Sequence, residues 1–166
     1  MSTALEATRE READRVIHCV ARLRCDAHHA FEMFTVGEQL QRWLAPQAEV
    51  EPRVGGKYEL FWEPPDRERN STLGCRVTAL QTDQFLSFEW KGPTQFKGFM
   101  NEADPLTHVV VFFSPVEVGS CVWTDVHLIH SGWRSTPLWE AAREWFEISW
   151  RGAFDELARQ VNGAEA

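Results

Sequence analysis

His130 is the side chain whose type and position best suit acid–base or ligand-binding chemistry in this sequence. Val126, Leu128 and His130 alternate along an expected strand at residues 121–130, so their side chains share one face. An imidazole on that face can hydrogen-bond a ligand or transfer a proton near neutral pH. The other interpretation is a structural histidine that caps the strand end through the turn at residues 131–132, because buried polar groups usually have partners of their own. The sequence leaves both interpretations open.

The remaining histidines and the cysteines do not follow the spacing of metal sites. His127 and His130 are an odd number of residues apart, so they point to opposite faces of a strand and no metal site is expected. His28 and His29 are adjacent in an expected helix, where neighbouring side chains diverge by about 100°, and both are expected in solvent. The four cysteines show no zinc spacing and are expected to be buried, reduced thiols: Cys19, Cys25, Cys75 and Cys121.

The signatures of common enzyme classes are missing. The chain contains no Gly-x-Ser-x-Gly elbow, no glycine-rich phosphate loop and no His-Glu-x-x-His motif. Glu59, Glu63 and Glu89 alternate with apolar neighbours and are expected to face water, so a paired-carboxylate site is not predicted. Catalysis is therefore less favoured than binding, and no cofactor is expected.

Aromatic residues give the stronger indication of function. Eight Trp and eleven Phe against one Tyr supply a large area of flat apolar surface. In one interpretation these rings bury roughly 150–250 Å² each as plain core. In the other they leave a ring-lined gap for a flat apolar ligand with one or two polar anchors. The candidate ligand-binding residues are Trp43, Tyr58, Trp62, Phe88, Trp90, His130, Trp145 and Trp150.

The hydrophobic pattern predicts the elements that would position these rings. β-Branched residues alternate with polar ones at residues 15–24, which predicts a first strand. Asp26 is a suitable N-cap for two short helices that meet at Gly37 and end at Pro46. Consecutive glycines in the segment 52–56 favour a turn, at which a hairpin should begin.

Further strands and a long helix are predicted in the rest of the chain. The strands are expected at residues 58–62, 72–80, 85–90, 107–114 and 121–130. The last two form a hairpin with Gly119 in its turn. Residues 91–105 form a long irregular segment, which is either a functional flap or an irregular edge. Apolar residues at three- and four-residue steps over 138–161 predict a long helix, capped by Thr136 and Pro137.

Five short phrases of sequence occur in an order and spacing that resemble the heat-shock-protein-90 ATPase activator-like (Aha-type) family. They are residues 26–31 followed by Trp43, 51–58 (Glu-Pro-Arg-Val-Gly-Gly-Lys-Tyr), 74–77 (Gly-Cys-Arg-Val), 86–90 (Leu-Ser-Phe-Glu-Trp) and 128–133 (Leu-Ile-His-Ser-Gly-Trp). The resemblance spans residues 16–161. It places the chain in the START-like (SRPBCC) superfamily, which includes lipid carriers, hormone receptors, polyketide cyclases and stress proteins.

The resemblance implies a fold, a cavity and a set of candidate functions. The implied fold is α+β of the helix-grip type, a curved antiparallel sheet of about six to seven strands wrapped around the C-terminal helix, with His130 directed toward that helix. Where the family has Gly-Thr before the last strand, this sequence has Trp123 and Thr124, so a longer hairpin is expected. Binding of a small hydrophobic or aromatic ligand is the favoured function. The alternatives are a co-chaperone-like or regulatory module with a chaperone or homodimer partner and, third, a cyclase or hydratase that uses His130.

Length and charge limit the domain organisation and the partners. The 166 residues suit one domain, expected at residues 14–162, with a charged arm at 1–13 and a short tail at 163–166. A net charge of −8 disfavours nucleic acid, because phosphate binding needs a surplus of Lys and Arg. No apolar run approaches the roughly twenty residues that cross a bilayer, and the first residues do not resemble a signal peptide. A cytoplasmic protein is therefore expected.

Overall fold

The computed structural model describes residues 15–163, so the predicted arm at 1–13 and most of the predicted tail at 163–166 lie outside the described residues. The elements within the described range are β1 (Ile17–Leu23), α2 (Ala27–Thr35), α3 (Gly37–Trp43), β2 (Gln47–Val50), β3 (Tyr58–Phe61), β4 (Val77–Gln81), β5 (Phe85–Trp90), α4 (Lys97–Met100), β6 (Thr107–Val118), β7 (Cys121–Ser131) and α5 (Pro137–Asn162).

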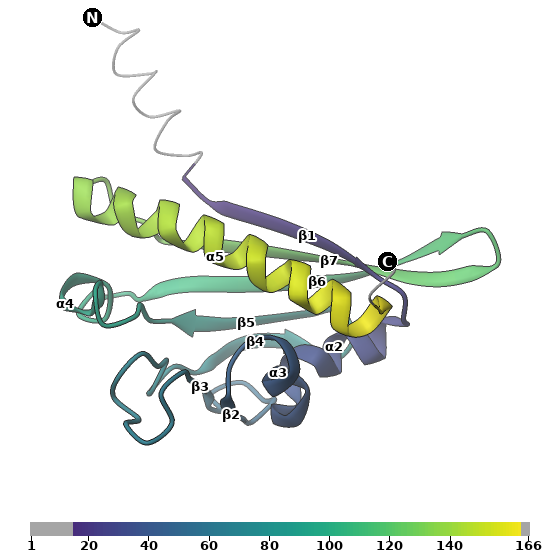
Figure 1. The fold of residues 1–166 in the computed structure, drawn as a ribbon, viewed down its shortest axis with the longest axis horizontal. Coiled ribbons are helices and arrows are strands. Elements are labelled where there is room, and N and C mark those ends of the chain that lie inside the picture. Colours follow the sequence, from purple (N-terminus) through teal and green to yellow (C-terminus); the bar gives the residue numbers. More distant parts are fainter. Residues whose placement is uncertain (1–14, 164–166) are drawn as a thin grey trace, which may run out of the picture.

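The strands pair antiparallel, and α5 lies along one face of the main sheet (Figure 1). Five strands are hydrogen-bonded in the order β1-β7-β6-β5-β4, while β2 and β3 form a two-stranded ladder. Isolated bridges from Lys57 to Arg76 and from Phe61 to Ser71 connect β3 to the chain that leads into β4. This architecture confirms the α+β helix-grip prediction, including the two short helices after the first strand.

Local sequence patterns explain why these segments form these elements. Buried and exposed residues alternate strictly along β1, because one face meets the core and the other meets solvent. Asp26 caps α2 by accepting a hydrogen bond from the backbone N–H of His29 at 2.8 Å. Thr136 does the same for α5, accepting from the backbone N–H of Trp139 at 3.3 Å. Both caps satisfy donors that the start of a helix leaves unpaired.

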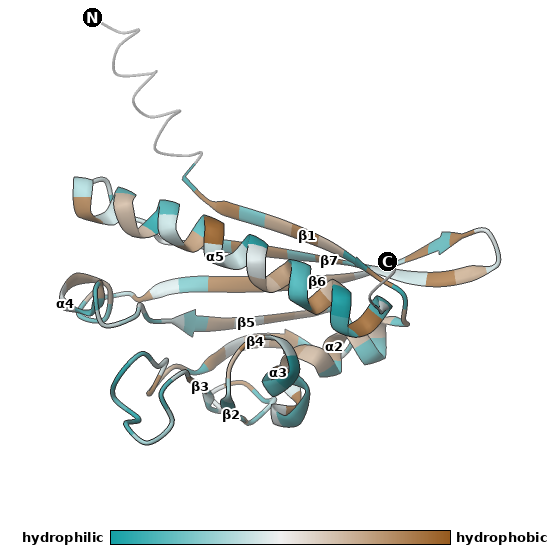
Figure 2. Ribbon diagram, in the orientation of Figure 1, coloured by the Kyte–Doolittle hydropathy of each residue, from teal (hydrophilic) through white to brown (hydrophobic). Residues whose placement is uncertain are grey.

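The core lies between α5 and the sheet. Figure 2 shows hydrophobic and hydrophilic residues alternating along α5, as expected for a helix with one buried stripe. The buried residues of that stripe are Trp139, Ala142, Phe146, Trp150, Phe154 and Leu157. Trp145 lies at the flank of the stripe and is 40% exposed, and its ring packs edge-on against Phe96.

β3 differs from the prediction that one face of this strand meets solvent. All four of its residues are buried, including Glu59, which was expected in water and is only 5% exposed. Arg67 reaches over this strand and lies 3.8 Å from the Glu59 carboxylate. β4 also begins later than predicted, at Val77, because a turn at residues 72–75 with Gly74 at a φ of 90° precedes it.

The β6–β7 hairpin is longer than its hydrophobic pattern indicated. Its register continues to the pair Val118 and Cys121, around a turn with Gly119 at a φ of 63°. In Figure 1 this end of the hairpin extends beyond the rest of the described fold. Cys121 lies at this end of the hairpin and is exposed, while Cys25, after β1, is half-buried. The prediction of four buried thiols is therefore correct only for Cys19 and Cys75.

Candidate functional site

A cavity of about 410 Å³ opens between the C-terminal end of β5, the segment that follows it, the segment 62–71 and one side of α5. Its apolar wall is mainly aromatic and is made by Trp62, Trp90, Trp145, Phe146 and Trp150. Its polar wall is made by Asn70, Ser71, Lys91, Gln95 and Ser149. The cavity therefore combines a ring-rich interior with a polar side.

Three indole rings define the inner wall of the cavity, and their N–H groups are in different states. The Trp90 ring lies 5.0 Å from Trp150 and 6.0 Å from Trp62, measured between centroids. Trp62 donates its Nε1–H to the Leu44 carbonyl at 3.0 Å, and Trp150 donates to Nδ1 of His130 at 3.1 Å. The Nε1–H of Trp90 is buried and has no acceptor among the described residues. Two of the rings are therefore fixed by hydrogen bonds, and the central ring is held by packing alone.

His130 is fully buried, and both of its ring nitrogens have partners. Because Nδ1 accepts from Trp150, the proton lies on Nε2, which is 3.0 Å from Oγ1 of Thr107. Burial, with a smaller contribution from His108, lowers the pKa of His130 to about 3. The imidazole is thus neutral near neutral pH and is not among the residues that line the cavity. In this geometry it holds Trp150 in place.

The structure divides the eight candidate ligand-binding residues into two groups. Trp62, Trp90, Trp145 and Trp150 line the cavity, and Trp90 and Trp150 also belong to the core. Trp43, Tyr58, Phe88 and His130 are buried and do not line the cavity.

The two aromatic residues nearest the short helices show why the second group is structural in this geometry. Tyr58 donates its hydroxyl to the Phe34 carbonyl at 2.8 Å, and its ring stacks on Phe88 with centroids 3.7 Å apart. Trp43 donates its Nε1–H to the Met33 carbonyl at 2.9 Å. Both rings are therefore fixed by hydrogen bonds to backbone carbonyls of α2. Strand and helix periodicity in the sequence does not predict these partners.

The polar wall joins two segments that are distant in sequence. Oδ1 of Asn70 accepts from the backbone N–H of Thr94 at 2.8 Å, so the segment 62–71 is tied directly to the segment after β5. Ser71 donates its hydroxyl to the Arg67 carbonyl at 2.5 Å. Lys91 donates from Nζ to the Leu73 carbonyl at 2.6 Å. These bonds give the rim of the cavity a defined shape.

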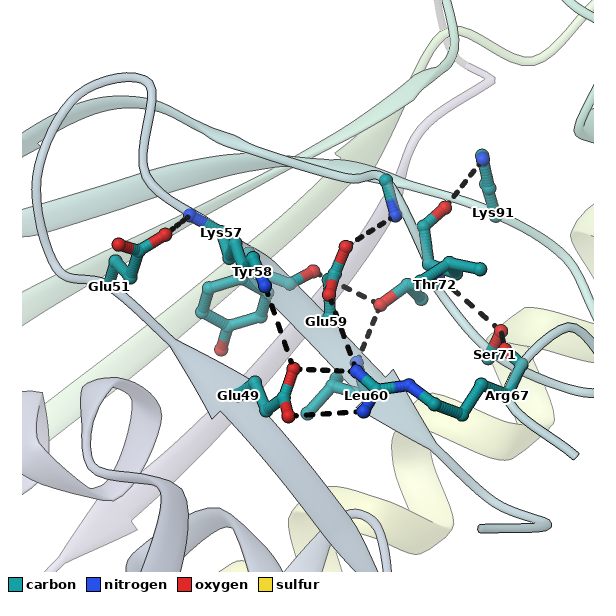
Figure 3. Close-up of polar contacts among 12 residues, drawn as sticks. Glu49, Glu51, Lys57, Tyr58, Glu59, Leu60, Arg67, Ser71, Thr72 and Lys91 are labelled. Carbon is teal, nitrogen blue, oxygen red and sulfur yellow. Dashed lines mark hydrogen bonds and ion pairs between the residues drawn. The ribbon is translucent and has the colours of Figure 1, made fainter. Parts of the chain in front are cut away.

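A polar network that the sequence did not reveal joins the buried Glu59 and Thr72 to the more exposed pair of Arg67 and Glu49 (Figure 3). Glu59 accepts from the backbone N–H of Gly74 at 2.7 Å, and Arg67 pairs with Glu49 at 2.6 Å while its guanidinium lies 4.3 Å from the Phe61 ring. The Arg67 hydrogen bond lowers the pKa of Glu49. Only the tertiary fold brings Arg67 over β3, so strand alternation alone placed Glu59 incorrectly.

Thr72 supplies the second part of this network. Its Oγ1 accepts from the Leu60 N–H at 2.9 Å and donates to the Tyr58 carbonyl at 3.1 Å. On this side of β3 only isolated bridges are present in place of a full strand pair. The Thr72 hydroxyl supplies hydrogen bonds to the β3 backbone between those bridges. The segment 62–71 is consequently anchored at both ends, which supports its role as a wall of the cavity.

Other kinds of site find little support in the described part of the chain. Residues 15–163 contain no group of three or more His, Cys, Asp or Glu side chains placed to hold a metal ion. Within the same range, no helix has the length and apolar character needed to cross a membrane. The aromatic cavity is the feature of the fold best suited to binding a small molecule.

Comparison with known proteins places this architecture among relatives. A family model described as activator of Hsp90 ATPase homolog 1-like protein matches residues 24–162. The chain belongs to this family. The match confirms the resemblance carried by the five phrases of sequence. No curated protein sequence matches the chain.

Several solved structures share the fold of this family member at low sequence identity. A protein from Mesorhizobium loti is 17% identical with a TM-score of 0.68, covering 89% of this chain and 96% of that chain. An HSP90 activator from Plasmodium falciparum is 20% identical with a TM-score of 0.65, covering 89% and 95%. The Aha1 dimer from Colwellia psychrerythraea is 16% identical with a TM-score of 0.63, covering 88% and 95%. At these identities the likeness establishes the fold alone.

Proposed function

We propose that this protein binds a small, flat, apolar molecule in the cavity between β5 and α5. The observation that carries the proposal is a cavity of about 410 Å³ whose wall contains five aromatic rings. Ligand sites commonly measure about 300–1,000 Å³ and combine apolar walls with a few polar groups. Aromatic rings favour a flat partner, since edge-to-face and offset contacts between rings add to the burial of apolar area.

The structure supports a binding role better than it supports catalysis of the cyclase or hydratase type. His130, the candidate general acid or base, is fully buried, does not line the cavity and uses both nitrogens for hydrogen bonds inside the protein. A pKa of about 3 makes it a weak base near neutral pH. The cavity wall offers hydroxyl, amide and ammonium groups for orienting a ligand.

Titration with a neutral, flat, solvent-sensitive dye such as Nile red tests the proposal. The wild-type protein should raise and blue-shift the dye emission, and the dye should quench tryptophan emission. Ala153→Phe fills the cavity from α5 and should weaken binding at least tenfold. Ala141→Phe is the matched control, because Ala141 is exposed on the same helix and does not line the cavity.

The outcome is decisive in either direction. Ser149→Phe is a second blocking variant at a half-exposed helix position, for use if Ala153→Phe disturbs folding as judged by circular dichroism. Loss of dye binding in a folded cavity variant but not in the control supports the proposal. The absence of any emission change with the wild-type protein, or equal binding by the blocked and control variants, would overturn it.

A co-chaperone or homodimer role is the second candidate. It is motivated by two structural neighbours, one an HSP90 activator and the other an Aha1 dimer. The ATPase rate of the chaperone from the same organism, measured with and without this protein, tests the first role. Sedimentation equilibrium tests the second. An unchanged ATPase rate and a purely monomeric protein would exclude both.

A further inference from the structure

We propose that the ligand carries an anionic group, such as a carboxylate, and that Lys91 is its partner. This inference rests on the proposed function of the same cavity. Lys91 directly follows β5, is half-buried and lines the cavity next to Trp90. It is the one charged residue in an otherwise ring-rich wall among the described residues.

The hydrogen bonds of Lys91 leave capacity for a ligand. Its Nζ donates to the Leu73 carbonyl at 2.6 Å, a bond that Figure 3 draws at the edge of the polar network. An ammonium group has three donors, so two remain beyond this bond. Within the described residues, Lys91 belongs to no ion pair and donates no other side-chain hydrogen bond. A half-buried ammonium without a counter-ion favours an anionic partner.

The nearby carboxylates are engaged elsewhere. Glu59 accepts from the Gly74 backbone and faces Arg67, and Glu89 accepts from the Arg76 backbone N–H at 3.1 Å. No acidic side chain lines the cavity, so Lys91 is the one charged group among its lining residues in the described chain. In a protein with a net charge of −8, this is a local exception that would select anions over cations at this site.

The rest of the wall offers further donors to such a ligand. The Gln95 amide and the Ser149 hydroxyl line the cavity and make no side-chain hydrogen bond within residues 15–163. The Nε1–H of Trp90, on the residue before Lys91, is buried and finds no acceptor in the described part of the chain. A ligand with a flat ring system for the tryptophans and one oxyanion for Lys91 would match both parts of the wall. Aromatic carboxylic acids are the chemical class with this shape and charge.

A pair of matched probes tests the inference: 2-naphthoate, which is ionised at neutral pH, and the neutral 2-naphthamide. Isothermal titration of the wild-type protein should show at least a roughly tenfold preference for the carboxylate, the ratio expected for one charge-assisted hydrogen bond. Lys91→Met keeps the apolar stem of the side chain and should abolish this preference, because the carboxylate loses more affinity than the amide. Lys97→Met is the matched control, because Lys97 is exposed in α4 and does not line the cavity.

The results separate this inference from the proposal on which it rests. If both probes bind wild type equally, or if Lys91→Met keeps the preference, the role of Lys91 is wrong while ligand binding stands. If neither probe binds wild type and Nile red also fails to bind, both proposals are overturned. If Lys91→Met does not fold, the wild-type preference is measured in rising salt, where a Lys91 ion pair predicts that the carboxylate affinity alone decreases.

Discussion

The space between β5 and α5 contains two adjoining regions that treat polar groups in opposite ways. In the sealed region, defined by Thr107, His130 and Trp150, both nitrogens of the imidazole and the Trp150 indole N–H have partners. In the cavity region, defined by Trp90, Lys91 and the other lining residues, residues 15–163 supply no acceptor for the Trp90 indole N–H and no counter-ion for Lys91. The two regions meet where the rings of Trp90 and Trp150 touch.

This contrast teaches how a single aromatic layer can serve both stability and binding. Buried polar groups stabilise a fold only when they are paired, and an unpaired buried donor typically costs about 1–3 kcal/mol. The sealed region satisfies that rule and should contribute to stability. The cavity region departs from it, which is the pattern expected where a ligand supplies the missing partners.

Replacing the central histidine should break the sealed region most severely. His130→Leu leaves the buried Trp150 N–H without its acceptor and removes the hydrogen bond to the Thr107 hydroxyl, which still donates to the Trp90 carbonyl, so the free energy of unfolding should fall by about 3 kcal/mol. Urea unfolding followed by circular dichroism measures the change. His127→Leu, on the opposite face of β7, is the control and should cost less than about 1 kcal/mol. Equal losses in the two variants would contradict the role assigned to His130.

Acidification should weaken the same region without any mutation. The unfolded chain binds a proton at His130 near pH 6.5, whereas burial lowers the folded pKa to about 3, so stability is present above pH 6.5 and is lost as the pH falls toward 3. Between pH 7 and pH 5 the loss should be about 2 kcal/mol.

Other titratable residues also affect how stability depends on pH. Asp83 raises the pKa of the exposed His28, which gives a contribution of opposite sign, so the measurement is best made in a His28→Asn background. The carboxylates with lowered pKa values, such as Glu49 and Asp125, lose their contributions at lower pH and do not affect this window. Burial also lowers the pKa of His108, which gives a loss of the same sign that remains in His130→Leu. Unfolding curves at both pH values should therefore show a larger loss with His130 present than in His130→Leu. A pH dependence that is unchanged in His130→Leu would show that another group is responsible.

Replacing the two rings that meet between the regions should give a smaller difference in stability. Trp150→Phe removes a donor that pairs with His130, whereas Trp90→Phe removes a donor that has no partner. Both variants lose similar ring area, so Trp150→Phe should be the less stable by about 1 kcal/mol. Matched urea midpoints of the two proteins measure the difference. If Trp90→Phe is equally or more destabilised, then packing rather than hydrogen bonding distinguishes the two rings.

The candidate site was only partly accessible from the sequence. Aromatic composition indicated a ring-lined space. Strand alternation placed His130 on one face with Val126 and Leu128, and the family resemblance directed that face toward the helix, where His130 lies. The same alternation failed for Glu59, because it assumed that the second face of β3 meets water, whereas Arg67 covers that face. Lys91 was overlooked because a single lysine after a strand has no local signal of an unpaired charge.

What the sequence determined by itself was the set of elements and their order. Hydrophobic periods, the caps at Asp26 and Thr136 and the glycines at turns are local properties, so they can be read without knowing what lies opposite each segment. Only the tertiary structure decided which tryptophans surround a cavity and which fill the core. That distinction depends on the distance between β5 and α5 and on how the segments 62–71 and 91–95 lie beside them, and no local pattern encodes those distances.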